Sequence, residues 1–179
     1  MHRTHILTLT IALALGVATL TMAPLMAVEA PAGSTIGAAV EDFTLPKLSD
    51  GSDVTFSSYK GKVVLLSFWA SWCGPCRREL PAYNKTYETY KDKGFEIVAI
   101  SVDRDTASAQ GFIDKLDGGV NYTLLLDAKS MVMGRFDIVS MPTSFLIGPD
   151  GKVLHKEVGF SDEKLAEMEK KIEAVLAAK

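Results

Sequence analysis

Two hydrophobic patterns alternate along most of the chain after about residue 42. Short apolar runs bounded by Gly, Pro or Asp are typical of buried strands, whereas apolar residues at every third or fourth position are typical of helices. Strands that alternate with helices and close on an antiparallel hairpin predict an α/β fold with a mixed central sheet. In chain order the predicted elements are a hairpin over 42–46 and 52–56, a strand over 63–70, a helix that follows residue 73 and ends by residue 94, a strand over 95–102, a helix over 105–116, a short strand over 122–126, a helix over 128–136, a hairpin over 143–147 and 152–158, and a final helix capped by Ser161.

The N-terminus follows neither pattern. A short basic start precedes an uncharged stretch over 6–28, and small residues follow it, which is typical of an export signal. Ala30-Pro31-Ala32 fits the small-x-small cleavage pattern, and cleavage there would start the mature chain at Gly33. Left uncleaved, a segment of this length is long enough to span a bilayer. Residues 1–32 are therefore predicted to be a signal peptide or an N-terminal membrane anchor.

Residues 33–179 have the length of one domain with a substantial core. The formal net charge of the chain is −3, so nothing indicates the basic surface that nucleic-acid binding requires. Export would place the protein in a periplasmic or other extracytoplasmic compartment, where thiols normally oxidise to disulfides. Because the chain has only 2 cysteines, it has placed both at one site and built its fold without further disulfides.

These cysteines lie in Trp72-Cys73-Gly74-Pro75-Cys76, at the turn between a predicted strand and a predicted helix. A helix N-terminus has unpaired backbone N–H groups and a favourable dipole, so it favours a thiolate over a thiol. This predicts Cys73 as a nucleophile. Cys76 falls one turn further along the helix, where it can close a disulfide with Cys73, and Pro75 fits an early helical position.

Two plainer interpretations of the cysteine pair are weaker. A disulfide that closes so short a loop removes little entropy from the unfolded chain, so it would stabilise the fold only slightly. A zinc site lacks ligands, because no second cysteine pair exists and the histidines are His2, His5 and His155, of which the first two lie in the leader. A catalytic dithiol without metal or cofactor is therefore predicted.

The chain resembles the thioredoxin superfamily from about Ile36 onward, and within it the exported TlpA-like and ResA-like thiol-disulfide oxidoreductases. The resemblance rests on the run from Phe68 to Cys76, on Pro81 after the inner cysteine, and on Met141-Pro142-Thr143 before the hairpin. It implies a thioredoxin fold, in which a mixed sheet is flanked by helices. It also implies an N-terminal β-hairpin and a helix-strand insertion over about 103–126.

The resemblance further implies which residues meet a substrate. Met141-Pro142 is expected to be a cis peptide that faces the dithiol, although sequence alone shows only an X-Pro bond, for which cis is the minority form. Trp72 borders Cys73 and is predicted to form an apolar docking surface with Met141 and Pro142. Trp69, inside the strand, is expected to be a core residue.

One departure from the family pattern points to a further catalytic residue. Cytoplasmic thioredoxins have a buried Asp six residues before the nucleophile, and this chain has Ser67 there, which cannot take up a proton. Glu79 lies three residues beyond Cys76, so both side chains fall on one helix face. Glu79 is therefore predicted to help deprotonate Cys76. The plainer interpretation is a surface glutamate favoured near a helix N-terminus.

The predicted reaction is thiol-disulfide exchange, in which Cys73 attacks a disulfide of a partner protein and Cys76 resolves the mixed disulfide. The Gly-Pro dipeptide between the cysteines is that of reducing thioredoxins, and the resemblance points to reduction of exported proteins, such as apocytochrome c before haem attachment. A reductase in an oxidising compartment must have its own disulfide reduced again after each turnover. The resemblance thus implies a membrane electron donor of the DsbD or CcdA kind.

Two other functions remain open. A thiol peroxidase shares the hairpin and the thioredoxin layout, but its Pro-x-x-x-Thr-x-x-Cys context would require Pro and Thr where this chain has Leu66 and Ala70. A redox-sensing binding module would hold a partner without turnover. The substrate protein and the oligomeric state are not encoded in any visible motif.

Overall fold

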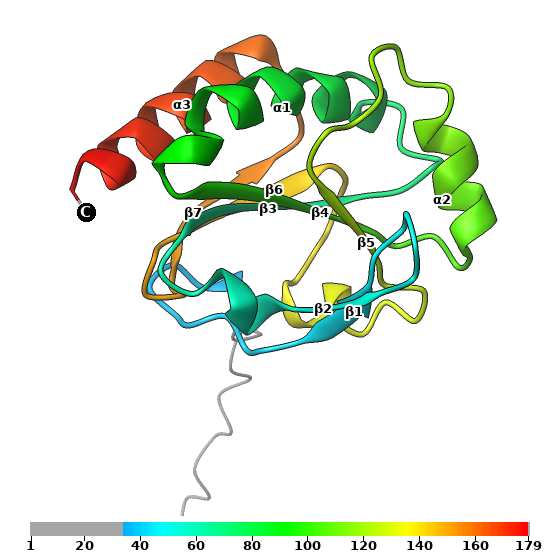
Figure 1. The fold of residues 1–179 in the computed structure, drawn as a ribbon, viewed down its shortest axis with the longest axis horizontal. Coiled ribbons are helices and arrows are strands. Elements are labelled where there is room, and N and C mark those ends of the chain that lie inside the picture. The colour runs from blue at the N-terminus through cyan, green and yellow to red at the C-terminus, as the bar shows by residue number, and fades with distance from the viewer. Residues whose placement is uncertain (1–33, 179) are drawn as a thin grey trace, which may run out of the picture.

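The computed structural model describes residues 34–178, and within them a five-stranded mixed sheet has the strand order β5-β4-β3-β6-β7 (Figure 1). β3 pairs in parallel with β4 and antiparallel with β6. β4 pairs in parallel with β5, and β6 pairs antiparallel with β7. The strand bounds are β3 Val63–Trp69, β4 Phe95–Ser101, β5 Thr123–Leu126, β6 Thr143–Ile147 and β7 Val153–Val158.

The helices α1 (Cys76–Tyr90) and α3 (Asp162–Ala177) lie side by side on one face of this sheet (Figure 1). Two hydrogen bonds join them, from Thr86 to Glu169 and from Tyr90 to Glu173, each at 2.7 Å. Ser161 accepts the backbone N–H of Lys164 and caps α3, as the sequence predicts. The shorter α2 (Thr106–Ile113) buries its apolar side chains in the same core.

The hairpin of β1 (Thr44–Pro46) and β2 (Asp53–Thr55) covers the opposite face, together with the 3-10 turns η2 (Phe56–Tyr59) and η4 (Met133–Arg135) (Figure 1). Alternate residues of a strand point to opposite faces, so β3 supplies both cores. Leu65 and Trp69 pack toward the helices, and Leu66 and Phe68 pack toward the hairpin. The mixed sheet with flanking helices, the N-terminal hairpin and the helix-strand insertion that ends in β5 are all confirmed.

The predicted helix over 128–136 is wrong. This segment contains only the single turn η4, because Ser130 adopts a left-handed φ of 53° that interrupts a right-handed helix. The buried Asp127 carboxylate also accepts backbone N–H groups of Met131, Val132 and Met133. A compact loop therefore replaces the helix.

Other boundaries differ by a few residues. The helix predicted over 105–116 begins after Asp105, whose side chain caps it by accepting the Ser108 N–H, and it ends at Ile113. α1 begins at Cys76 and continues through a 3-10 turn, η3 (Lys91–Lys93), to Gly94, whose φ of 81° ends the helical stretch.

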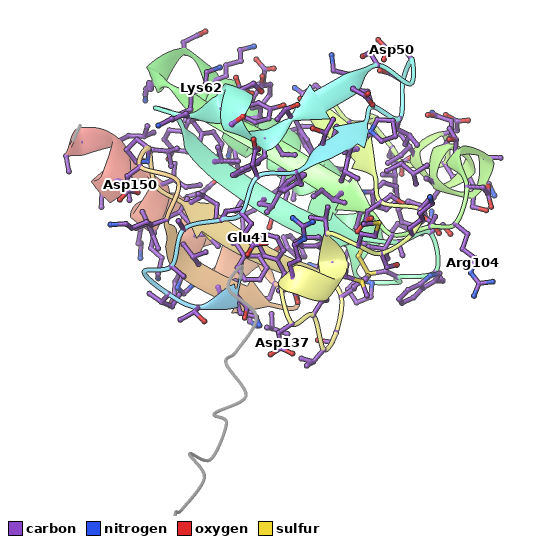
Figure 2. All side chains as sticks on the ribbon, turned by 90° about the horizontal axis from the view of Figure 1, so that it is seen from below. Glu41, Asp50, Lys62, Arg104, Asp137 and Asp150 are labelled. Carbon is purple, nitrogen blue, oxygen red and sulfur yellow. A yellow bond between two sulfur atoms is a disulfide. The ribbon has the colours of Figure 1, made fainter. Side chains whose placement is uncertain are left out.

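Many charged side chains lie at the periphery, and Figure 2 shows Arg104 and Asp137 projecting away from the ribbon. The predicted leader over 1–32 lies outside the described residues. In the described part of the chain, none of the helices has the length and apolar character that crossing a membrane requires.

Candidate active site

The two cysteines form a disulfide at the junction between β3 and α1. Their Cα atoms are 5.4 Å apart, and α1 begins at Cys76. The backbone N–H of Cys76 donates a hydrogen bond to Sγ of Cys73 at 3.3 Å. Because N–H groups at a helix start have no carbonyl partner within the helix, they favour negative charge on this sulfur in the reduced protein. Cys73 is 4% exposed and Cys76 is fully buried, so Cys73 is the more accessible of the two.

The turn that leads to the dithiol is held by Asp103, which follows β4. The backbone N–H and the hydroxyl of Ser71 donate to its carboxylate at 2.9 and 2.7 Å, and the Ser101 hydroxyl donates to it at 2.8 Å. β3 and β4 are parallel neighbours, so the segments that follow them meet at one edge of the sheet. Sequence reasoning assigned Asp103 no role at this site, and its place just after a buried strand was the available signal.

Glu79 points inward from the first turn of α1 and is 1% exposed. The Ser67 hydroxyl donates to its Oε2 at 3.1 Å, and the Tyr83 hydroxyl donates to its Oε1 at 2.9 Å. Burial raises the pKa of Glu79 from its ordinary 4.5 to about 7, and the two hydrogen bonds oppose this rise by stabilising the charged form. The plain interpretation of Glu79 as a surface residue is therefore wrong.

The polar group around Glu79 extends to a second strand. Ser67 of β3 and Ser144 of β6 are direct cross-strand partners, and the Tyr83 hydroxyl lies 3.2 Å from Oγ of Ser144. Burial and the neighbouring Glu79 charge raise the pKa of Tyr83 well above 10. Sequence reasoning missed Tyr83 and Ser144 as members of the site. The spacing of Tyr83 four residues after Glu79 was the only local signal.

The structure brings the expected docking residues close to the dithiol segment. Met141-Pro142 is a cis peptide, as the resemblance implies. The pairing of Phe68 with Thr143 places this dipeptide beside the residues that lead from β3 to Cys73. Met141 packs against the core cluster that contains both cysteines, Pro142 is buried, and Trp72 is 70% exposed.

Other charged residues near the dithiol have partners. Arg77 and Arg78 are exposed; the Arg77 guanidinium lies 4.9 Å from the centre of the Phe112 ring, and Arg78 pairs with Asp162 at 3.3 Å. Over residues 34–178, no cluster of three or more His, Cys, Asp or Glu side chains is arranged to hold a metal ion.

Residues 35–176 match the family model described as Redoxin. This chain belongs to the Redoxin family. It is 36% identical over 124 residues to the thiol-disulfide oxidoreductase ResA of a Bacillus cereus strain, and the match covers 69% of this chain and 70% of that protein. It is also 36% identical over 117 residues to ResA of Bacillus subtilis, covering 65% of this chain and 64% of that one.

A protein of known structure has the same architecture. The crystal structure of a putative thiol:disulfide interchange protein DsbE, from Chlorobium tepidum, superimposes with a TM-score of 0.75 at 39% identity. The match covers 80% of this chain and 99% of that chain. With its redox-active cysteine pair and these relatives, the protein is an enzyme of the thiol-disulfide oxidoreductase class with a thioredoxin fold.

The structure gives no support to a peroxidase site in this Redoxin-family protein. Leu66 and Ala70 occupy the positions where a thiol peroxidase would need Pro and Thr, and both are fully buried among apolar side chains. Neither side chain has a hydroxyl to polarise a peroxide.

Burial of Glu79 predicts a pH-dependent stability. Because its pKa is raised to about 7 on folding, the folded chain holds this proton more tightly than the unfolded chain does. The contribution of Glu79 is therefore full below pH 4.5, is lost as pH rises to about 7, and is constant above that. We expect this loss to lower the free energy of unfolding by about 3 kcal/mol, and we expect Glu79→Gln to lack it.

Urea unfolding of the oxidised protein at a series of pH values measures this difference. Glu167→Gln, at an exposed position of α3, is the matched control and should follow the wild type. Parallel pH curves for wild type and Glu79→Gln would contradict the expectation.

Proposed function

We propose that this protein reduces disulfides of exported proteins, with Cys73 as the nucleophile and Cys76 as the resolving thiol. The observation that carries the assignment is the hydrogen bond from the Cys76 backbone N–H to Sγ of Cys73 at the start of α1. A thiolate is the attacking species in disulfide exchange, and this position stabilises it. The name thiol-disulfide oxidoreductase carried by the ResA relatives supports the same reaction.

The exchange takes two steps. The Cys73 thiolate attacks one sulfur of the substrate disulfide, the substrate S–S bond breaks, and the released substrate thiolate takes a proton from water. The Cys76 thiolate then attacks Sγ of Cys73, which breaks the mixed disulfide and releases the second substrate thiolate. Two electrons pass to the substrate, and the protein is left with the Cys73–Cys76 disulfide of the structure.

Glu79 is proposed to take the proton of Cys76 before the second step. The two residues are three positions apart on α1, and both are buried. A carboxyl group with a pKa of about 7 accepts and returns a proton efficiently near neutral pH. Because Cys76 is fully buried, bulk water does not reach its thiol, and a protein group is needed as the base.

Trp72, Met141 and Pro142 are proposed to bind the substrate segment. Trp72 is the large exposed side chain next to Cys73, and the cis dipeptide lies beside the end of β3, from which the chain continues to the cysteines. An extended substrate segment that pairs with backbone here would gain affinity with little demand on its sequence. This suits an enzyme that acts on unfolded or flexible proteins, such as apocytochrome c before haem attachment.

The leader supports an extracytoplasmic site of action, either as a cleaved signal or as an N-terminal anchor. A reductase in an oxidising compartment loses its electrons with each turnover. A membrane electron donor of the DsbD or CcdA kind is therefore the proposed partner that restores the dithiol.

The order of the cysteines predicts different outcomes for two variants. Cys73→Ser should abolish disulfide reduction, because the attacking thiolate is gone. Cys76→Ser should accumulate mixed disulfides with native partners, because the resolving thiol is gone. Insulin reduction measures the first outcome, and non-reducing electrophoresis after expression with the intact leader measures the second. Covalent complexes formed by Cys73→Ser instead would reverse the assignment.

The direction of the reaction predicts the reduction potential. A reductase should have a potential nearer to the roughly −270 mV of thioredoxin than to the roughly −120 mV of the oxidant DsbA. Equilibration of the Cys73–Cys76 pair with glutathione or dithiothreitol buffers, followed by thiol trapping, measures it. A potential close to that of DsbA would make the protein an oxidase and rule out reduction as its function.

If Trp72 binds the substrate segment, its removal should affect protein disulfides and small disulfides differently. Trp72→Ala should raise KM for a protein disulfide by roughly fivefold, because a truncated aromatic anchor typically costs about 1 kcal/mol or more. Reduction of a small disulfide, which does not cover the surface around Trp72, should continue at the wild-type rate. Ile36→Ala also removes an exposed large apolar side chain and is the control. Equal loss on both substrates would show that Trp72 acts on the dithiol and not on docking.

A further inference from the structure

Four polar side chains form a closed group inside the apolar core between the sheet and α1. All four are at most 3% exposed, and they hydrogen-bond to one another. β3 supplies Ser67, β6 supplies Ser144, and α1 supplies Glu79 and Tyr83. Burying a polar group lowers the stability of the fold unless the group is hydrogen-bonded. The hydrogen bonds within this group offset that loss.

The Tyr83 hydroxyl is the centre of this group. Its oxygen lies 2.9 Å from Oε1 of Glu79 and 3.2 Å from Oγ of Ser144. A phenol hydroxyl has one proton, so it donates to one of these neighbours and accepts from the other. A charged carboxylate can only accept, which requires Tyr83 to donate to Glu79 and Ser144 to donate to Tyr83. When Glu79 carries a proton, the Tyr83 hydroxyl is free to turn and donate to Ser144.

We propose that Tyr83 is a positioning residue for the dithiol reaction, whose hydroxyl sets the proton affinity of Glu79 by turning between Glu79 and Ser144. The inference rests on the proposed proton exchange between Cys76 and Glu79. It adds a residue whose hydroxyl hydrogen-bonds to Glu79 and Ser144 and acts on the reaction through the carboxyl group. Tyr83 itself stays protonated throughout, because its own pKa is raised well above 10.

The groups that hydrogen-bond to the Glu79 carboxylate, and so influence its proton affinity, are hydroxyls. Among the described residues, no cation pairs with the carboxylate: α1 contributes Tyr83, β3 contributes Ser67, and β6 contributes Ser144 behind Tyr83. The pKa of the titratable Tyr122, just before β5, is raised by burial and by the Glu79 charge acting through space, and Tyr122 donates its own hydroxyl to the Leu80 carbonyl oxygen at 2.8 Å. The α3 side chains in this core are apolar, including Met168 and Ile172.

Tyr83→Phe tests the inference because it keeps the ring and removes only the hydroxyl. Glu79 then loses one of its two donors, and the charged form loses more than the neutral form. We expect the midpoint of the Glu79 titration to rise by about one pH unit. Carbon-13 NMR of the Glu79 carboxyl group, assigned by its loss in Glu79→Gln, measures the midpoint in the oxidised protein without reference to activity.

Tyr90→Phe is the matched control on the same helix. It removes a hydroxyl that donates to Glu173 of α3 and lies outside the group around Glu79. The Glu79 midpoint should not move in this variant. The pH profile of protein-disulfide reduction should shift upward with the midpoint in Tyr83→Phe, remain unchanged in Tyr90→Phe, and lose the Glu79 step in Glu79→Gln.

A measurement on the wild type keeps the test independent of how Tyr83→Phe folds. If the Tyr83 hydroxyl turns, the carbon-13 signal of its Cζ should titrate with the midpoint of Glu79, and this step should vanish in Glu79→Gln. A flat Tyr83 signal, or an unmoved Glu79 midpoint in folded Tyr83→Phe, overturns the role of Tyr83 while the Glu79 step of the pH profile stands. A moved midpoint without any change in the pH profile overturns proton exchange by Glu79, and with it the positioning role.

Discussion

β3 is buried on both faces, and this constraint decides where chemistry can occur in the fold. Its residues are at most 1% exposed, and alternate side chains pack against the helices and against the hairpin. No reactive group can reach solvent along the strand. The first place where the chain leaves the sheet is the turn after Trp69, and there the start of α1 offers unpaired N–H groups. A thiolate site at this point follows from the packing of the strand.

The carboxyl group of Glu79 lies against this buried strand, and burial raises its pKa. A buried carboxylate without a cation normally takes up a proton, because the charged form loses its hydration. Here the hydroxyls of Ser67 and Tyr83 oppose that loss, and the pKa of Glu79 stays at about 7. Ser67 occupies the position where thioredoxins have a buried Asp. In the proposed mechanism the acid therefore lies on the helix rather than on the strand, and the Ser67 hydroxyl donates to its carboxylate.

Local patterns predicted the strands, the hairpins, the cysteine turn and the Ser161 cap, because each depends on residues close in sequence. They failed over 128–136, where apolar spacing resembles that of a helix but the Asp127 carboxylate takes three backbone N–H groups. The inward direction of Glu79 follows from its spacing from Cys76. The link from Glu79 through Tyr83 to Ser144 does not follow from local spacing, because it depends on the register of β3 against β6, which pairs Ser67 with a residue far away in the sequence.

Two buried carboxylates, Asp103 and Glu79, lie near the dithiol segment and differ in their hydrogen-bond partners. One holds the turn in place, and the other is proposed to exchange a proton. Asp103 accepts a backbone N–H of Ser71, so any movement of this carboxylate would move the turn that carries Trp72 and Cys73. Within residues 34–178, Glu79 accepts only from hydroxyls, which rotate about a single bond while the backbone stays in place. A proton can therefore enter or leave Glu79 without displacing the cysteines. In the proposed mechanism this matters because Cys76 must lose its proton while Cys73 holds the substrate in a mixed disulfide.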